Sequence, residues 1–252
     1  MLTSLQYRLL KKIAGAPQDD ASCDGFGGLD KLRIHIGTDS LALFRDKTVI
    51  DFGCGTGSEA IAIARLGARR VLGIDNREHI LAQARTSAIQ AGVQDNCHFA
   101  TSTTEPAQII ISLDAFEHFA DPGGILGLMH GLLLPDGQAL VSFGPTWYHP
   151  MGGHLFSVFP WAHLLFSEGA LIRWRSDFKT DGARRFGEVE GGLNQMTIRR
   201  FCQLVEHSPF RLERLELVPI RKLRSVHNAW TREFTTSLVR CRLVSRTGSA
   251  SK

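Results

Sequence analysis

Three glycines at alternate positions follow a short apolar run near residue 50, and they constrain the fold more than any other feature. The run Val49–Phe52 contains an acid and leads into Gly53–Gly57, after which Ser58 can open a helix. Glycine lets the backbone turn tightly and lets a ligand touch the main chain, because no Cβ stands in the way. Doubly wound α/β folds bind cofactors at such a loop after their first strand. The sequence therefore predicts an α/β fold with a ligand at this loop.

The spacing of the glycines separates the kinds of site that use such loops. A dinucleotide site has the fingerprint G-x-G-x-x-G, which Gly55, Gly57 and Ala60 match only when forced. A P-loop needs Gly-Lys-Ser or Gly-Lys-Thr at its end, and no such triplet follows Gly57. Neither alternative explains glycines at 53, 55 and 57.

The loop resembles motif I of the class I methyltransferases, which use S-adenosylmethionine (SAM). That motif is an acid, any residue, and three alternating glycines, and D-F-G-C-G-T-G at residues 51–57 matches it position by position. Val71–Asp75, an apolar run that ends in an acid, and Asp114–His118, which follows the run Ile109–Leu113, are similar to later family motifs. The resemblance covers residues 45–145 well and continues more loosely to about 245. The segment at 114–118 favours SAM over a dinucleotide.

Asp75 lies 22 residues after Gly53, at the end of the second apolar run. A carboxylate there can accept hydrogen bonds from both ribose hydroxyls of a nucleoside cofactor. SAM and dinucleotides share this geometry, so Asp75 supports a nucleoside without choosing between them. Asp75 or Asn76 can also cap a helix over Arg77–Ala91, and that role is compatible with ribose binding.

The resemblance implies the other cofactor contacts. The glycine loop would contact the methionine part of SAM, Asn76 would lie against the adenine, and Cys54 would be a small neighbour rather than a nucleophile. Many family members have an acid after strand three that binds the adenine amino group, but Thr101–Thr104 occupies that stretch here, so a hydroxyl or backbone group is expected instead. The implied cofactor residues are Asp51, Gly53, Cys54, Gly55, Gly57, Asp75, Asn76, Leu113, Asp114 and Phe116.

Strand and helix patterns alternate along most of the chain, which predicts an α/β fold with a doubly wound, mostly parallel sheet and helices on both faces. A helix over Gly124–Leu134 is expected to end at the turn Pro135–Gly137. Thr197 is expected to cap another helix that runs to Glu206. The resemblance adds an antiparallel C-terminal hairpin, which makes seven strands. We expect these strands at 48–51, 71–74, 96–100, 109–113, 139–143, 210–219 and 237–244.

Two parts of the chain fall outside this alternation. Residues 46–252 are expected as the methyltransferase domain, with an insertion over about 144–195. The insertion is rich in proline, glycine and aromatic residues and follows the carboxyl end of a strand, where ligands bind. Residues 1–45 are expected as an N-terminal helical segment, in which 24–37 forms a lid. The expected hinges of the lid are Gly25, Gly27, Gly28 and Gly37.

Histidine suits a base that deprotonates a methyl acceptor, because its ordinary pKa is near neutrality. His118 is expected near the methyl group, either as this base or as a residue that only shapes its loop. His154 and His149 lie in the aromatic insertion, where either can face the acceptor, whereas His163 resembles a packed helix residue. The catalytic candidates are therefore His154, His149 and His118. Their spacing is not diagnostic of a metal site, so no metal is expected.

Charge and hydropathy limit the partners. Residues 171–252 hold 17 Lys and Arg against 8 Asp and Glu, which would suit an RNA surface. These charges alternate with apolar residues as on solvated strand faces, so no nucleic acid is expected. No apolar run reaches the roughly 18 residues of a membrane span. Residues 2–13 place their leucines on one helical face, which predicts packing on the domain or a partner, with contact of residues 1–14 to a membrane surface as the alternative.

The odd number of five cysteines and the lack of an export signal predict a reducing cytoplasm. The resemblance implies SAM-dependent methyl transfer to a small-molecule acceptor, and we expect an oxygen acceptor on an apolar or aromatic metabolite. An RNA methyltransferase and a nicotinamide-dependent oxidoreductase stay open as alternatives. A homodimer is the assembly that we consider beside the monomer.

Overall fold

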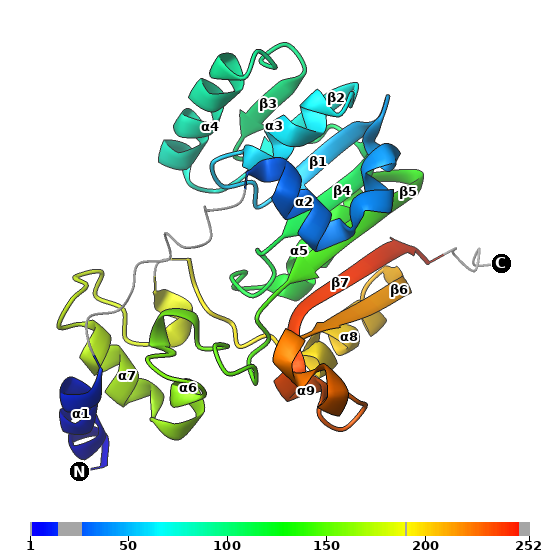
Figure 1. Ribbon diagram of the computed structural model, residues 1–252. Coiled ribbons are helices and arrows are strands. Elements are labelled where there is room, and N and C mark those ends of the chain that lie inside the picture. Colours follow the sequence, from blue (N-terminus) through cyan, green and yellow to red (C-terminus); the bar gives the residue numbers. More distant parts are fainter. Residues whose placement is uncertain (1, 15–26, 190, 247–252) are drawn as a thin grey trace.

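A seven-stranded mixed sheet forms the centre of the protein (Figure 1). The computed structural model describes residues 2–14, 27–189 and 191–246. The strand order is β3-β2-β1-β4-β5-β7-β6, in which β7 runs antiparallel to both of its neighbours and the other pairs are parallel. The predicted doubly wound fold with an antiparallel C-terminal hairpin is confirmed. The strands are β1 (Thr48–Phe52), β2 (Arg70–Ile74), β3 (Cys97–Ala100), β4 (Ala107–Leu113), β5 (Leu133–Phe143), β6 (Phe210–Pro219) and β7 (Thr236–Ser245).

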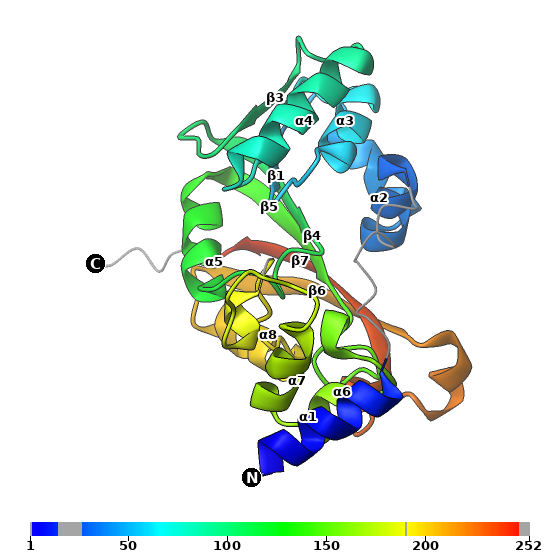
Figure 2. The same cartoon turned by 90° about the vertical axis from the view of Figure 1, so that its left-hand side faces the viewer.

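Helices cover both faces of the sheet, and each face buries its own apolar cluster. Figure 2 shows α5 and α8 on one side of the sheet and α2 on the other. Strand β4 contributes residues to both clusters, because Ile109 and Ile111 belong to one and Ile110 to the other. A strand buried on both faces reads as a continuous apolar run. The helices are α2 (Gly28–Ile36), α3 (Ser58–Arg65) and α4 (Glu78–Gln90) on one face, and α5 (Pro122–Gly131) and α8 (Ile198–Glu206) on the other.

The boundary between α5 and β5 differs from the expected one. Asp121 caps α5 by accepting a hydrogen bond from the Gly124 N–H at 2.9 Å, and the helix ends at Gly131, before the predicted Leu134. The turn predicted at Pro135–Gly137 is wrong. These residues lie within β5, at a register shift where the ladder with β4 passes from Leu133 directly to Gln138.

The strand order places β1 and β4 side by side, although β2 and β3 lie between them in the sequence. The chain leaves β1 toward one edge of the sheet, crosses back to β4 and continues toward the other edge. The carboxyl ends of strands at such a switch point form the crevice where open α/β sheets bind ligands. The glycine loop follows β1, and Asp114–His118 follows β4. The fold therefore brings the two motifs to one place.

Residues 144–195, here called the cap, lie next to the sheet and contain only short helices (Figure 1). A third apolar cluster holds the cap together around Trp174, Phe156 and Phe186. The predicted insertion thus has a small core of its own. Its elements are η3 (His154–Phe156), α6 (Ala162–Leu165), α7 (Glu168–Arg175) and η4 (Phe186–Glu188).

Helix α1 (Leu2–Ile13) lies against α7 of the cap, and α2 lies against α3, so the segment before β1 is divided between two parts of the fold. Leu10 is fully buried. Packing therefore accounts for only part of the apolar face of α1, and membrane contact of residues 1–14 stays a prediction. Among the described residues, no helix is both long and apolar enough to cross a membrane. The side chains of α1 that remain 48–67% exposed are Leu2, Leu5, Leu9 and Ile13.

The closing hairpin carries a connection of its own, formed by η5 (Arg221–Val226) and α9 (Arg232–Thr235). The Glu233 carboxylate of α9 accepts hydrogen bonds from the N–H groups of Ile198 and Arg199 at 3.0 and 2.9 Å. These N–H groups at the start of α8 lack partners inside the helix, and a carboxylate there also suits the helix dipole. The connection between β6 and β7 is therefore tied to α8.

The predicted lid contains the packed helix α2, which is followed by η2 (Thr38–Phe44). His35 of α2 is only 8% exposed. Gly28 lies so close to the start of α3 that a Cβ built on it would overlap the backbone carbonyl of Ser58. Gly28 therefore serves close packing, and its role as a hinge stays a prediction. Residues 24–26, which include the expected hinge Gly25, lie outside the described residues.

The variant Gly28→Ala should push α2 away from α3 and lower the free energy of unfolding by about 1–3 kcal/mol. Denaturant unfolding measures this loss. Gly27→Ser is the matched control, because nothing lies within 4 Å of a Cβ at Gly27 and serine is a favourable helix cap. The control should keep the wild-type stability, and equal losses in both variants would contradict the packing role of Gly28.

Candidate functional site

The glycine loop has a backbone conformation that suits glycine at all three positions. Gly53, Gly55 and Gly57 have φ values of 86°, 51° and 81°, a region that glycine enters without strain. A Cβ on Gly53 would lie 2.8 Å from the Ala115 Cβ, and one on Gly57 would lie 2.5 Å from the Phe99 ring. A Cβ on Gly55 would have nothing within 4 Å. Packing therefore requires two of the glycines, and Gly55 leaves the main chain open to a ligand.

The end of β2 holds the loop in place. Two N–H groups of the loop donate to the Ile74 carbonyl at 2.8 and 3.0 Å, and the Gly55 N–H donates to the Asp75 carboxylate at 3.1 Å. The Arg77 side chain donates to both oxygens of the same carboxylate at 3.0 Å. Burial works to raise the pKa of Asp75, but these hydrogen bonds outweigh it and lower the pKa. Asp75 is therefore an ionised acceptor at neutral pH.

Asp51, the second-last residue of β1, is a buried acid, 3% exposed, whose Oδ2 atom has no hydrogen-bond partner within the described residues. Burial raises its pKa to about 8, and the Glu59 carboxylate adds to the rise, whereas the Lys31 ammonium opposes it. Burying a polar atom without a partner is costly. Asp51 therefore marks a place for a cationic or N–H group from a ligand.

The residues present fit the predicted cofactor. SAM carries an ammonium group, which suits the orphaned Asp51 oxygen, and a carboxylate, which suits open backbone N–H groups such as those near Gly55. Cys54 lies between them, and burial raises the pKa of its thiol strongly. A neutral thiol agrees with the expected role of Cys54 as a small neighbour rather than a nucleophile.

The other implied cofactor residues have different surroundings. Asn76 is exposed beside Asp75, and Leu113 is buried in the apolar cluster under α3. Phe116 is fully buried in the opposite cluster and packs edge-on against Phe119. Phe119, which sequence reasoning missed, stands near Gly53. Phe116 therefore reaches the site only through Phe119. In the hydroxyl-rich stretch, Thr101, Ser102 and Thr104 are exposed, whereas the Thr103 hydroxyl accepts the Glu105 N–H at 3.0 Å.

Asp114 connects the end of β4 to helix α2. Its carboxylate lies 3.5 Å from the Lys31 Nζ atom and 3.3 Å from the His35 Nε2 atom, and Lys31 also lies 3.6 Å from Glu59. Burial raises the pKa of Asp114 against the opposing charge of Lys31. Sequence reasoning missed Lys31 and His35. Their spacing of four residues, which puts two side chains on one face of a helix, was the available signal.

His35 links Asp114 to the end of β5 as a neutral ring. Burial lowers the pKa of His35 to about 4, and the charge of Lys31 adds to this. The Nε2–H group therefore donates to the Asp114 carboxylate, and Nδ1 accepts from the Ser142 hydroxyl at 2.8 Å. Helix α2 is thus fastened to the carboxyl ends of both β4 and β5.

The structure brings candidate histidines from two motifs together. The rings of His118 and His154 lie edge to face with centroids 5.3 Å apart. Burial lowers the pKa of His149 to about 4 and that of His154 to about 3, so both are neutral. His163 has the packed role expected of it, because its Nε2 atom lies 2.6 Å from the Trp147 carbonyl. In residues 2–14, 27–189 and 191–246, no group of three or more His, Cys, Asp or Glu side chains is placed to hold a metal ion.

Hydrogen bonds decide which ring nitrogen of each histidine can take up a proton. The His118 Nδ1 atom lies 2.9 Å from the Gly192 carbonyl. A carbonyl only accepts, so Nδ1 carries a proton, and in the neutral ring Nε2 keeps a lone pair. In His149 the Nδ1 atom instead accepts the Met151 N–H at 3.0 Å, so the proton is on Nε2. The buried Nε2 atom of His154 has no partner within the described residues. His118 therefore presents a free basic nitrogen, whereas the basic nitrogen of His149 is already engaged.

The two ends of the cap hold the turn that carries His118. The Asn194 side chain donates to the carbonyls of Phe116 and Phe119 at 2.7 and 2.8 Å. At the other end, the Gly144 N–H donates to the Glu117 carboxylate at 3.1 Å. Burial raises the pKa of Glu117 to about 7. The position of His118 therefore depends on the cap as well as on β4.

Comparison with known proteins decides the family. The family model described as "Methyltransferase domain" matches residues 31–213, from within α2 to within β6. The chain belongs to this methyltransferase family. The predicted enzyme class and its cofactor SAM are confirmed at the level of the family.

The curated relatives match a limited part of the chain. The ribosomal protein L11 methyltransferase of Vibrio cholerae serotype O1 (strain M66-2) is 37% identical over 97 residues, which are 38% of this chain and 33% of that protein. The protein of the same name from Pasteurella multocida (strain Pm70) is 46% identical over 71 residues, 28% of this chain and 24% of its own. The chain therefore spans about a third or less of these relatives.

Solved structures extend the similarity to nearly the whole chain. The magnesium protoporphyrin IX methyltransferase of Synechocystis PCC 6803 with bound S-adenosylhomocysteine (SAH) has a TM-score of 0.55 at 17% identity, covering 97% of this chain and 96% of that one. The [4+2]-cyclase SpnF has a TM-score of 0.56 at 12% identity, covering 98% and 94%. At such identities the similarity concerns the fold, which a cyclase shares, and it assigns no acceptor.

The variant Asp51→Asn should flatten the dependence of stability on pH in the protein without cofactor. The contribution of Asp51 to the free energy of unfolding is present in full below its unfolded pKa of 3.8 and is lost as the pH rises to about 8. The reason is that the folded protein retains a proton that the unfolded chain releases in this range. Denaturant unfolding at pH 4 and pH 8 measures this loss. Asp95→Asn, a change at an exposed site, is the control and should keep the wild-type pH dependence. An unchanged dependence in Asp51→Asn would show that the folded acid ionises normally.

Proposed function

We propose that this protein transfers the methyl group of SAM to an oxygen atom of a small apolar or aromatic acceptor. The observation that carries the proposal is the contact of the His118 Nδ1 atom with the Gly192 carbonyl at 2.9 Å. Its Nδ1–H is engaged by the Gly192 carbonyl, which leaves Nε2 as a basic nitrogen on the turn that follows β4. A hydroxyl acceptor must lose a proton during methylation, and a histidine with a free nitrogen can take it up.

The cofactor half of the proposal assigns each group of SAM to a side chain or N–H of this protein. When bound, SAM supplies a methyl group activated by the sulfonium. Asp51 would hold the ammonium group, and the loop backbone near Gly55 would face the carboxylate. Asp75 would accept the ribose hydroxyls, but Arg77 and Gly55 already fill its hydrogen-bonding positions. Ribose binding therefore requires the Arg77 side chain to release this carboxylate.

On the acceptor side, the protein mainly has to position a hydroxyl and exclude water. The cap supports both tasks, because it has an apolar core and is hydrogen-bonded to the turn that carries His118. His154 packs against His118 and would help to set the orientation of its ring. An apolar or aromatic acceptor between the cap and this turn would bury apolar surface, which favours its binding over that of a polar acceptor.

Particular observations make the alternative functions less favourable. A dinucleotide site requires the G-x-G-x-x-G spacing, which Gly57 does not satisfy at the start of α3. The basic C-terminal strands pair part of their charge internally, for example Arg240 with Glu216 at 2.9 Å, which reduces their value as an RNA surface. The name of the L11 methyltransferases describes those proteins, whose similarity covers at most 42% of this chain. A cytoplasmic location and a homodimer stay predictions.

The variant Asp75→Ala should weaken SAH binding by about tenfold or more, because it removes charge-assisted hydrogen bonds to the ribose. Calorimetry with SAH measures the affinity. The matched control is Arg77→Ala, which removes the competitor for the same carboxylate and should leave binding equal or tighter. Unchanged affinity in Asp75→Ala would refute the ribose assignment, and tight NAD binding without SAH binding would refute the proposed cofactor.

The acceptor itself is accessible to a screen of metabolite extracts with isotope-labelled SAM. Mass spectrometry should reveal a labelled methyl group on the oxygen of a small molecule. Labelling of RNA or of a ribosomal protein in the matching extracts, without a small-molecule product, would favour one of the alternatives.

With that acceptor, His118→Gln should lower kcat by about 100-fold or more, because the base is lost, while SAH affinity stays within about threefold. Steady-state kinetics and calorimetry measure the two quantities. His207→Gln, at an exposed position after α8, is the control. A kcat close to the wild-type value in His118→Gln would mean that His118 only shapes its turn.

A further inference from the structure

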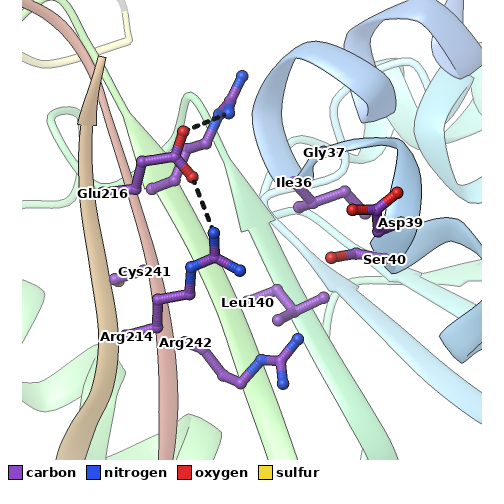
Figure 3. A pocket seen from close by; sticks show the side chains of 10 residues that line it. Ile36, Gly37, Asp39, Ser40, Leu140, Arg214, Glu216, Cys241 and Arg242 are labelled. Carbon is purple, nitrogen blue, oxygen red and sulfur yellow. Dashed lines mark hydrogen bonds and ion pairs between the residues drawn. The ribbon is translucent and has the colours of Figure 1, made fainter.

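A cavity lies on the outer part of the sheet, apart from the glycine loop. It has a volume of about 250 Å³ and separates the junction of α2 and η2 from the strands β5, β7 and β6 (Figure 3). Gly37 lies at this junction with a φ of 84°, and nothing stands within 4 Å of the position of a Cβ. Because Gly37 has no side chain, none projects from this position into the cavity.

Positive charge exceeds negative charge around this cavity. Arg214, Arg240 and Arg242 line it together with the acids Glu216 and Asp39, so three positive charges stand against two negative ones. Glu216 is shared, because it accepts a hydrogen bond from Arg240 at 2.9 Å and lies 3.7 Å from Arg214. In Figure 3, Glu216 lies between two guanidinium groups. Arg240 and Arg214 therefore share the charge of Glu216, which leaves the lining with one excess positive charge.

Arg214 and Arg242 face each other directly across the ladder of β6 and β7. Like charges at directly opposed positions of an antiparallel pair repel. Neither guanidinium makes a hydrogen bond to another described residue, and each has one long ion pair, Arg214 with Glu216 and Arg242 with Glu213, both at 3.7 Å. The Nε atom of Arg242 is buried without a partner within the described part of the chain. The two guanidinium groups thus keep unused hydrogen-bond donors and repel each other. An anion from outside the chain can accept from these donors and offset the repulsion.

We propose that this cavity binds a small organic anion through a phosphate or carboxylate group held between Arg214 and Arg242. Guanidinium groups present paired donors that match the oxygens of both kinds of anion, and a negative charge between them would remove the repulsion. Figure 3 places the Ser40 side chain across the cavity from these arginines, where its hydroxyl can contribute a further donor. The volume of about 250 Å³ is several times the roughly 30 Å³ that one water occupies, so the cavity has room for more than a lone phosphate. The apolar side chains of Ile36 and Leu140 line the same space and suit the organic part.

The cavity is connected to the candidate active site by a short path. Arg240 pairs with Ser142 in the ladder of β7 and β5, and the Ser142 hydroxyl contacts His35, which contacts Asp114. Binding in this cavity should therefore change the surroundings of the His35 ring, whereas binding at a distant surface should not. His35 thus reports where the anion binds. The proposed methyl transfer is not needed for this inference, because anion binding is measured without SAM or an acceptor.

Nuclear magnetic resonance titration of the full chain tests the proposal. Inorganic phosphate, glycerol 3-phosphate and citrate are added separately at constant ionic strength, with sodium chloride as the blank. We expect saturable shifts of the Arg242 Nε–H and His35 ring signals with a Kd of about 1 mM or tighter for at least one of these anions. Tighter binding of the phosphates or of citrate decides between the two headgroups. Shifts no larger than those of the chloride blank for all three anions would overturn the proposal.

Variants place the site. The double variant Arg214→Gln/Arg242→Gln should weaken anion binding by about tenfold or more. Arg211→Gln/Arg221→Gln changes the net charge equally at exposed positions outside the cavity and should bind like the wild type. Equal weakening in both double variants would assign the effect to overall charge and overturn the site.

Ser40→Glu, which keeps both arginines, supplies an internal carboxylate, and it should abolish anion binding while raising the melting temperature. Undiminished anion binding in Ser40→Glu would also overturn the site.

Discussion

The hydrogen bond from the Gly55 N–H to the Asp75 carboxylate joins two parts of the site that lie 20 residues apart in the chain. Together with the two bonds from the loop to the Ile74 carbonyl, it fixes the glycine loop at the crevice of the sheet. The loop in turn lies against Ala115 and Phe99, which leaves no room for side chains at Gly53 and Gly57. The rest of the site is arranged around a backbone that these contacts hold still.

Buried acidity is the second property of this site. Asp51, Glu59 and Asp114 are carboxylates of low exposure that share the ammonium group of Lys31. Burial raises the pKa of Asp51 and of Asp114, which means that the protein without a ligand carries the cost of their desolvation. A ligand with a sulfonium and an ammonium group brings the charge that these acids lack. The electrostatics of the site therefore agree with the cofactor of the family, independently of the glycine spacing.

The accuracy of the sequence predictions follows the range of the interactions involved. The buried strands were predictable, because apolar runs such as Ile109–Leu113 are determined by burial on both faces. The Thr197 cap is confirmed by its hydrogen bond to the Arg200 N–H, which is a local contact. The turn at Pro135–Gly137 was wrong as the start of the strand, because β5 already pairs with β4 at Leu133 and these residues form the register shift that follows. Phe116 and Phe119 are three residues apart, and only packing shows which of them stands beside Gly53.

The sequence by itself determined the family, the sheet and the position of the glycine loop, because glycine spacing, strand hydropathy and a strand-end acid are local properties of the chain. Only the tertiary structure decided the contacts between distant segments. The tautomer of His118 depends on a carbonyl 74 residues away, and the surroundings of Asp114 depend on Lys31 and His35 of α2. The opposition of Arg214 and Arg242 depends on the register of β6 and β7. These contacts arise from packing and pairing, which a pattern along one segment does not contain.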